Sequence, residues 1–297
     1  MSEISDLIRK MFGEGDAKRD AGLTTPDDIE RFDDIVYGEL PEWQSLDVYR
    51  PKNTEGKLPV IVSVHGGGWV YGNKEGYQWY CMNLAQRGFA VVNFTYRLAP
   101  EFKFPASLED TNSVFTFVME NAEKYGFDTN NIFAVGDSAG AHNLGLYASI
   151  SSNPDYASNF NFKAPKDFSL RAIALNCGAY VIDLPKEGEE PTQTQMLMWD
   201  LLPNKGTAEE LELINVTKHI TSNYPETFFM TATGDFLRDD APKLREALDK
   251  NNVPYTFHYY MNKELDLPHV FHCNIKDTVD AKKCNDDECS FFKSRMI

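Results

Sequence analysis

The sequence predicts an α/β fold in which helices cover both faces of one mostly parallel sheet of eight strands. Short β-branched and aromatic runs alternate with helical patterns along the chain, which is typical of strand–helix–strand units. Residues 58–64 are almost wholly apolar, as a parallel strand buried on both faces must be. A chain of 297 residues is long enough for one domain with a large core.

Each expected strand is a short run rich in β-branched or aromatic residues. The first two runs lie close together and could pair as a hairpin. The strands are expected at residues 32–37, 45–50, 58–64, 89–95, 131–135, 171–177, 227–232 and 254–260. Helical spacing predicts helices at residues 106–125, 139–152, 239–251 and about 276–292.

Two segments depart from this alternation. The first, residues 1–31, is expected to form an N-terminal cap ahead of a main domain at residues 32–297. The second, residues 179–225, is a long stretch between two strands and could be a cap insertion, because long insertions often form lids. We expect at least one of them to cover the site, although both could simply pack on the core. The first carries the stripe of an amphipathic helix: Ile4, Leu7, Ile8, Met11 and Phe12.

The charge balance excludes several classes of partner. The net charge is −16, from 45 acidic and 29 basic residues, and an acidic surface repels nucleic acid and anionic membranes. No apolar run is long enough for stable membrane insertion. The first residues lack the charged and apolar regions of a signal peptide, so a cytoplasmic location is expected.

The cysteines indicate free thiols in a reducing compartment. Their number is odd, no CxxC pair occurs, and the stretch between the last two is acidic without histidine. We therefore expect neither a disulfide framework nor a structural metal site. The five are Cys81, Cys177, Cys273, Cys284 and Cys289.

A candidate nucleophile lies in residues 136–140, which read GDSAG between an expected strand and an expected helix. A turn this sharp crowds the residues two before and two after the serine, so both must be small. It also pushes the Ser138 hydroxyl out at the carboxyl edge of the sheet, above a helix N-terminus with partial positive charge. The alternative is an ordinary glycine-rich turn.

A candidate oxyanion hole follows the third expected strand, where residues 65–69 read HGGGW. Acyl transfer places negative charge on the former carbonyl oxygen, and backbone N–H groups aimed at one point stabilise it. Consecutive glycines let the backbone approach closely. We expect Gly67, Gly68 and Ala139 to donate, with His65 orienting the loop. A plain flexible turn or a phosphate cradle are the alternatives, but a cradle would carry Lys-Ser/Thr or GxGxxG spacing.

A serine hydroxyl needs a base to accept its proton. Two of the six histidines, His269 and His272, follow the last expected strand, at the edge where α/β sheets place their chemistry. We favour His269, which follows Pro268 in an apparent loop, and His272 remains its competitor. The other four lie in the glycine loop, in the helix after Ser138, in the insertion and inside the last strand: His65, His142, His219 and His258.

The imidazole in turn needs an acid to hold its tautomer. Asp235 follows Gly234 near the end of the seventh expected strand, on the same edge of the sheet. Asp266 is an alternative, as are Asp239 and Asp240, which we expect instead to cap the following helix. The chain order Ser138, Asp235 and His269 is the order found in α/β-hydrolases.

These residues resemble the hormone-sensitive-lipase-like branch of the α/β-hydrolases, the bacterial family IV esterases and acetyl esterases. The resemblance covers about residues 45–275 and rests on HGGGW, YRLAPE with FPA, GDSAG, GDFLRD and HVF, at residues 65–69, 96–101, 104–106, 136–140, 234–239 and 269–271. It implies the α/β-hydrolase fold and an N-terminal cap over the active site. The family commonly has Asp-Pro-Leu and His-Gly-Phe where this chain has Asp-Phe-Leu at 235–237 and His-Val-Phe at 269–271.

We therefore expect a serine carboxylesterase that hydrolyses short-chain, acetyl-type esters by two-step acyl transfer, without metal or organic cofactor. The expected partner is a small-molecule ester, such as an acetylated carbohydrate, and the chain could form a homodimer. Aromatic residues could line the entrance or merely pack: Trp69, Tyr71, Tyr77, Trp79 and Tyr80. The pocket candidates are Trp69, Tyr71, Tyr96 and Trp199.

Two rival functions use the same fold. Peptidases of this fold usually carry a second domain such as a propeller, for which 297 residues leave no room. Small-molecule receptors related to this family have lost the catalytic histidine, whereas this chain has a candidate in His269.

Overall fold

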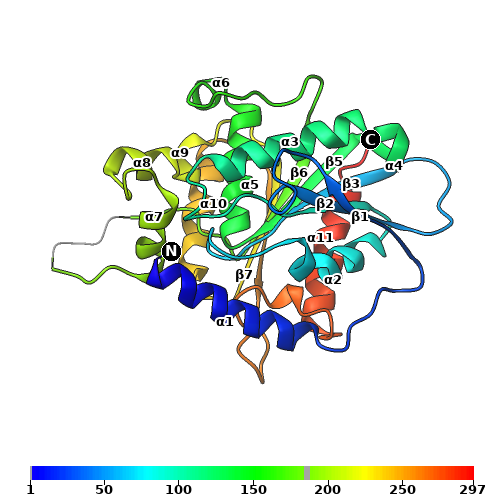
Figure 1. Ribbon diagram of the computed structural model, residues 1–297, viewed down its shortest axis with the longest axis horizontal. Helices are drawn as coiled ribbons and strands as arrows, with labels where there is room; N and C mark the ends of the chain where they lie inside the picture. The colour runs from blue at the N-terminus through cyan, green and yellow to red at the C-terminus, as the bar shows by residue number, and fades with distance from the viewer. Residues whose placement is uncertain (1, 184–187) are drawn as a thin grey trace.

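The computed structural model describes residues 2–183 and 188–297. Their strands form one eight-stranded sheet in the order β1-β2-β4-β3-β5-β6-β7-β8 (Figure 1). Strand β2 pairs antiparallel with β1 and with β4, and the other neighbours are parallel. The predicted mostly parallel sheet and its opening hairpin are confirmed. The strands are β1 (Ile29–Val36), β2 (Ser45–Pro51), β3 (Leu58–Val64), β4 (Ala90–Phe94), β5 (Phe127–Asp137), β6 (Leu170–Asn176), β7 (Glu226–Ala232) and β8 (Tyr255–Tyr260).

The helices fall between and around these strands. The segment predicted as an insertion contains three short helices, α7 to α9. The α-helices are α1 (Glu3–Asp20), α2 (Lys74–Ala85), α3 (Ala106–Glu120), α4 (Ala122–Tyr125), α5 (Ala139–Ser152), α6 (Pro154–Ala157), α7 (Gln193–Leu201), α8 (Ala208–Leu213), α9 (Val216–His219), α10 (Ala241–Lys250) and α11 (Asp280–Lys293). Two 3-10 turns, η1 (Arg238–Asp240) and η2 (Phe271–Cys273), complete the described elements.

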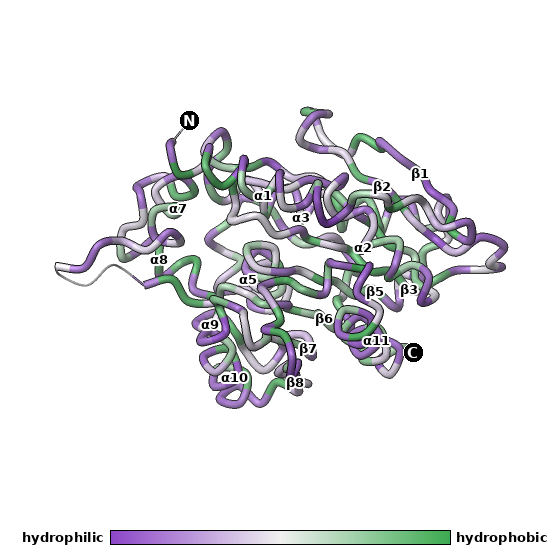
Figure 2. Tube along the Cα trace, turned by 90° about the horizontal axis from the view of Figure 1, so that it is seen from below, coloured by the Kyte–Doolittle hydropathy of each residue, from purple (hydrophilic) through white to green (hydrophobic). Residues whose placement is uncertain are grey.

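Alternation along the central strands divides the core into two layers. Val60, Val62 and Val64 of β3 join a cluster with side chains of α1, α3, α5 and α10, whereas Ile61 joins a second cluster with α2 and α11. The sheet is therefore covered on both faces, as the apolar run at 58–64 predicted. Figure 2 shows α5 as largely hydrophobic inside the fold and edge strand β1 as largely hydrophilic.

Several boundaries differ from the prediction. The helix predicted at residues 106–125 is broken, because the Asn121 side chain donates to Phe117 O at 3.0 Å and competes with the helical pattern. The first strand begins at Ile29, so the sheet includes residues assigned to the cap segment. Strand β5 is longer than predicted because it pairs with β3 and β6 over most of its length.

Helix α2 was not predicted. Its buried residues recur at helical spacing, but we considered its aromatic residues only as an entrance or as packing. The expectation that Asp239 and Asp240 cap the next helix is wrong. Asp240 makes no cap hydrogen bond, and its Oδ2 instead accepts from the N–H groups of Tyr180 and Val181 at 2.8 and 3.2 Å.

Helix α1 forms where the apolar stripe predicted it. Ile8 is buried, but Leu7 and Met11 are about half exposed, so the stripe is only partly covered. In the described part of the chain, no helix is both long and apolar enough to cross a bilayer. All five cysteines are buried free thiols.

Candidate active site

Ser138 occupies the tight turn that joins β5 to α5. Its backbone has φ 53° and ψ −120°, a strained conformation for a residue with a side chain. A Cβ at Gly136 would lie 2.5 Å from Gly140 O, and a Cβ at Gly140 would lie 2.1 Å from Val64 O. The prediction that both flanking residues must be small agrees with this crowding, which leaves no room for a Cβ.

A carboxylate and an imidazole meet at the same edge of the sheet. His269 Nδ1 lies 2.6 Å from Asp235 Oδ1. The loops that carry them are held together by a parallel bridge between Gly234 and Pro268, and Gly234 N donates to Leu267 O at 2.9 Å. The two residues expected as acid and base are thus brought together.

Hydrogen bonds hold Asp235 in its ionised form. Burial opposes its ionisation, but the hydrogen bond and charge of His269 lower the pKa of the carboxyl below its ordinary value. Thr231 Oγ1 donates to Oδ2 at 2.6 Å, and Leu237 N donates to Oδ1 at 2.9 Å. The carboxylate is therefore fixed in place and accepts the hydrogen of His269 Nδ1.

One cavity of about 290 Å³ brings these groups together. Ser138, His269, Gly67, Gly66 and Asp137 all line it. The nucleophile candidate, the base candidate and one expected oxyanion donor therefore face the same space.

In the glycine loop, hydrogen bonds to the carbonyl oxygens set the direction of the N–H groups in the same peptide units. A planar trans unit points its N–H opposite to its C=O. His65 Nδ1 donates to Gly66 O at 2.7 Å, which fixes the unit that carries the Gly67 N–H. Tyr71 N donates to Gly67 O at 3.0 Å, which fixes the unit that carries the Gly68 N–H. Gly67 and Gly68 have φ values of +117° and +60°, which glycine adopts without strain.

The third expected donor belongs to the turn of the nucleophile. Ala139 is the first residue of α5, so its N–H has no acceptor within the helix. His142 N donates to Ser138 O at 3.1 Å and fixes the unit that carries this N–H. Ser138 N donates to Asn176 O at 2.9 Å, which ties the turn to the end of β6.

His65 supports the loop and is not placed as a base. Its ring stacks on Tyr96 with centroids 4.0 Å apart, and Tyr96 Oη donates to His65 O at 2.8 Å. Burial lowers the pKa of His65 to about 4, so the ring is neutral.

Of the pocket candidates, only Tyr71 lines the cavity at Ser138 among the residues that the structure describes. Trp69 is buried and donates from Nε1 to His142 Nδ1 at 3.1 Å, so it anchors the glycine loop on α5. The Tyr96 ring stacks on His65. Trp199 is half exposed on α7 and lines a separate small cavity. These three side chains therefore do not line the cavity at Ser138.

The individual residues of one cavity wall were not predicted. This wall comes from α1, in the segment expected as a cap, and the apolar stripe indicates a buried face but not which residues line the cavity. The α1 residues are Met11, Phe12, Gly15, Asp16 and Arg19.

Two further wall residues are the departures from the family pattern. The Phe236 ring lies 4.3 Å from the His269 ring, and Phe236 is 67% exposed. Val270 has φ +51°, a left-handed conformation that is costly for a β-branched residue and natural for the glycine common in the family. Both departures from the family sequence therefore lie in the cavity wall.

Helix α1 is fixed to the loop after the glycines. Tyr71 Oη donates to Asp16 Oδ2 at 2.9 Å, and Arg9 Nε donates to Val70 O at 2.8 Å. Arg9 also pairs with Glu101 at 2.6 Å. Figure 1 shows α1 beside α7, which it contacts, so the N-terminal segment and the insertion meet.

Two clusters in the described residues group three potential metal ligands within 4.8 Å. One is Cys177, Asp235 and His269, and the other is Asp137, His272 and Cys273. Burial raises the pKa of both cysteine thiols well above the ordinary value, which opposes the thiolate that binds metals. In the first set, Asp235 and His269 are hydrogen-bonded to each other.

A sheet of this order, with a serine turn after β5 and an Asp–His pair after β7 and β8, defines the α/β-hydrolase class. The family model BD-FAE matches residues 46–239. The chain belongs to this family of α/β-hydrolases and is an esterase of the hormone-sensitive-lipase-like branch.

Named relatives agree with this assignment. The carboxylesterase NlhH of Mycobacterium tuberculosis is 30% identical over 74% of this chain and 72% of its own. The versiconal hemiacetal acetate esterase of Dothistroma septosporum is 27% identical over 75% of this chain and 70% of its own. The inhibited esterase B of Lactobacillus rhamnosis shares the fold, with a TM-score of 0.89 at 22% identity over 99% of this chain and 97% of its own.

Proposed function

We propose that this esterase is a serine carboxylesterase for short-chain, acetyl-type esters, with Ser138 as nucleophile, His269 as base and Asp235 as the acid that orients it. The proposal depends above all on the Asp235–His269 hydrogen bond of 2.6 Å beside the cavity that Ser138 lines. Helix α1 is the cap of this site in our proposal, because it supplies one wall of the cavity.

The mechanism is two-step acyl transfer. With Nδ1 engaged by Asp235, His269 uses Nε2 to take the proton of Ser138 as its Oγ attacks the ester carbonyl. The oxyanion accepts hydrogen bonds from the N–H groups of Gly67, Gly68 and Ala139. His269 then protonates the leaving alkoxide, and water repeats both steps to release the acid and restore the serine.

The size and lining of the cavity support a short acyl group. A volume of about 290 Å³ is at the low end for ligand cavities. Several lining side chains are apolar or aromatic: Met11, Phe12, Tyr71, Phe236 and Val270. The name of the Dothistroma relative, an acetate esterase, agrees with an acetyl-type substrate.

The test combines Ser138→Ala with a series of p-nitrophenyl esters of rising acyl length. The alanine variant should lose turnover and fluorophosphonate labelling while its circular dichroism is unchanged. In the wild type, kcat/KM should fall steeply beyond short chains. Residual esterase activity in Ser138→Ala contradicts the assignment of the nucleophile. A wild type that is not labelled indicates a receptor, and equal rates on long-chain emulsions contradict the substrate class.

A further inference from the structure

At the wall of the cavity, one tyrosine hydroxyl joins the glycine loop to the turn of the nucleophile. Tyr77 Oη accepts from Gly66 N at 3.0 Å and donates to Asp137 Oδ2 at 2.7 Å. Gly66 belongs to the glycine loop, and Asp137 is covalently bonded to Ser138. The hydroxyl is therefore the link between the proposed oxyanion donors and the proposed nucleophile.

The junction is tightly packed. A Cβ at Gly66 would lie 2.5 Å from Asp137 Oδ2 and 3.0 Å from Tyr77 Oη. Tyr77 is 7% exposed and Asp137 is 3% exposed, so bulk water has little access to replace the hydroxyl. Each partner would be left with an unsatisfied buried polar group if the hydroxyl were removed.

The Tyr77 hydrogen bond acts on the peptide unit next to the donor. Tyr96 Oη donates to His65 O, and Tyr77 Oη accepts from Gly66 N, so the 65–66 unit is held at both ends. The following unit carries the Gly67 N–H and is held by His65 at its carbonyl. If the 65–66 unit could rotate, the neighbouring unit would rotate with it, and the direction of the Gly67 N–H would change.

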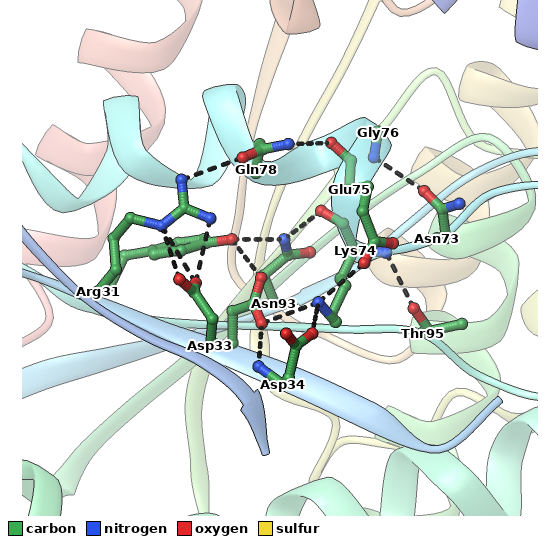
Figure 3. A network of polar contacts seen from close by, with 12 residues as sticks. Arg31, Asp33, Asp34, Asn73, Lys74, Glu75, Gly76, Gln78, Asn93 and Thr95 are labelled. Carbon is green, nitrogen blue, oxygen red and sulfur yellow. Dashed lines mark hydrogen bonds and ion pairs between the residues drawn. The ribbon is translucent and has the colours of Figure 1, made fainter. Parts of the chain in front are cut away.

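Helix α2 holds the Tyr77 ring in place from outside. Figure 3 shows Lys74, at the first turn of α2, in a polar network with β1, with Asn93 of β4 and with Thr95 after it. Its Nζ pairs with Asp34 at 2.7 Å and with buried Asp47 at 3.0 Å, and its N–H donates to Thr95 Oγ1 at 3.0 Å. The helix start is thus attached to the sheet three residues before the tyrosine.

The carboxylate strengthens the link. A hydroxyl that donates to an anion becomes a better acceptor, so Asp137 increases the attraction between Tyr77 Oη and Gly66 N–H. Burial raises the pKa of Asp137 to about 6, so the carboxyl is mostly ionised above neutral pH.

We propose that Tyr77, held by Asp137, is a positioning residue that sets the oxyanion donors of the glycine loop relative to Ser138. This inference rests on the proposed function and adds a residue that acts through the glycine loop and the turn of the nucleophile. Its contribution should appear when charge develops on the oxyanion and not when the neutral ester binds.

The test compares Tyr77→Phe with Tyr80→Phe. The control variant also removes a tyrosine hydroxyl, three residues further along α2. Tyr80 is 2% exposed and donates to buried Glu288 Oε1 at 3.0 Å, so the control also disturbs a buried carboxylate. The substrate is p-nitrophenyl acetate. The second probe is a trifluoromethyl ketone, whose adduct with Ser138 carries an oxyanion.

Tyr77→Phe should lower kcat about 10- to 100-fold with KM changed less than about twofold, because misaimed donors weaken only the charged state. Binding of the trifluoromethyl ketone should weaken by a similar factor. Tyr80→Phe should change each value less than about threefold. The inference is overturned if the two variants behave alike or if the loss in Tyr77→Phe lies in KM.

Asp137 variants test the link even if Tyr77→Phe folds poorly. Asp137→Asn keeps an acceptor for the hydroxyl and should retain more kcat than Asp137→Ala. The double variant Tyr77→Phe/Asp137→Ala should lose little more than either single variant, because both disrupt one link. Additive losses, or equal losses in the Asn and Ala variants, overturn the inference. If Ser138→Ala itself keeps full activity, the proposed function fails instead.

Discussion

His269 Nδ1 and Asp235 Oδ1 lie 2.6 Å apart, although the two residues are 34 positions apart in the chain. The Asp235 carboxylate is wholly shielded from solvent, whereas the His269 side chain is 17% exposed. Asp235 is therefore the buried partner of this contact, and His269 is the partner that reaches the cavity. The contact determines which imidazole nitrogen carries the hydrogen.

Asp235→Asn should lower kcat about three to four orders of magnitude, because an amide stabilises the wrong imidazole tautomer. The fold should survive, since the amide has the same shape. Steady-state kinetics on p-nitrophenyl acetate measures the effect. The matched control is Asp239→Asn, which changes an exposed carboxylate of the same loop. A loss below tenfold in Asp235→Asn would show that another acid orients His269.

The two histidine candidates should separate clearly. His269→Ala should lower kcat about a thousandfold or more, because it removes the base. His272 is completely buried, and burial lowers its pKa to about 3, so His272→Gln should leave kcat within about threefold and act on stability. Kinetics with thermal unfolding measures both effects. If His272→Gln is the inactive variant, the assignment of the base is wrong.

Gly67→Ala should destroy activity and lower stability together. A Cβ there would lie 2.0 Å from Tyr71 O, at a φ of +117° that alanine avoids. Gly88→Ala is the control, because its φ is +92° with no atom within 4 Å of the added Cβ. The control should cost about 1 kcal/mol of unfolding free energy and keep full kcat/KM. Urea unfolding and kinetics distinguish strain alone from loss of the oxyanion donor.

A buried carboxyl in α11 should make the protein less stable as pH rises. Burial raises the pKa of Glu288 from the ordinary 4.5 to about 7, so between these values the folded state binds a proton that the unfolded state has released. The unfolding free energy should therefore fall as pH rises from about 4.5 to 7, by about 3 kcal/mol from this group.

Glu288→Gln should flatten that dependence in urea unfolding at pH 5 and pH 8. Asn176 donates to Glu288 Oε2 at 2.6 Å and can turn its amide to accept from the new glutamine instead. Glu246→Gln, which removes an exposed carboxylate of α10, should leave the pH dependence unchanged. An unchanged slope in Glu288→Gln would refute the contribution of this carboxyl.

Local patterns were sufficient for much of the fold and for the chemical groups. The apolar run of β3 and the small residues around Ser138 each reflect a constraint within a few residues, so spacing reveals them. Asp240 and Trp69 show where such reasoning fails. Asp240 binds backbone N–H groups of Tyr180 and Val181, and Trp69 donates to His142. Both partners are distant in sequence, and no local pattern identifies them.

The sequence by itself determined the α/β class, the turn that presents Ser138 and the glycine loop, because these depend on backbone constraints between near neighbours. Only the tertiary structure decided that His269 rather than His272 meets Asp235 and which residues of α1 line the cavity. It also decided that Tyr77 joins the glycine loop to Asp137. These contacts depend on how separate elements pack, and packing is a property of the whole chain.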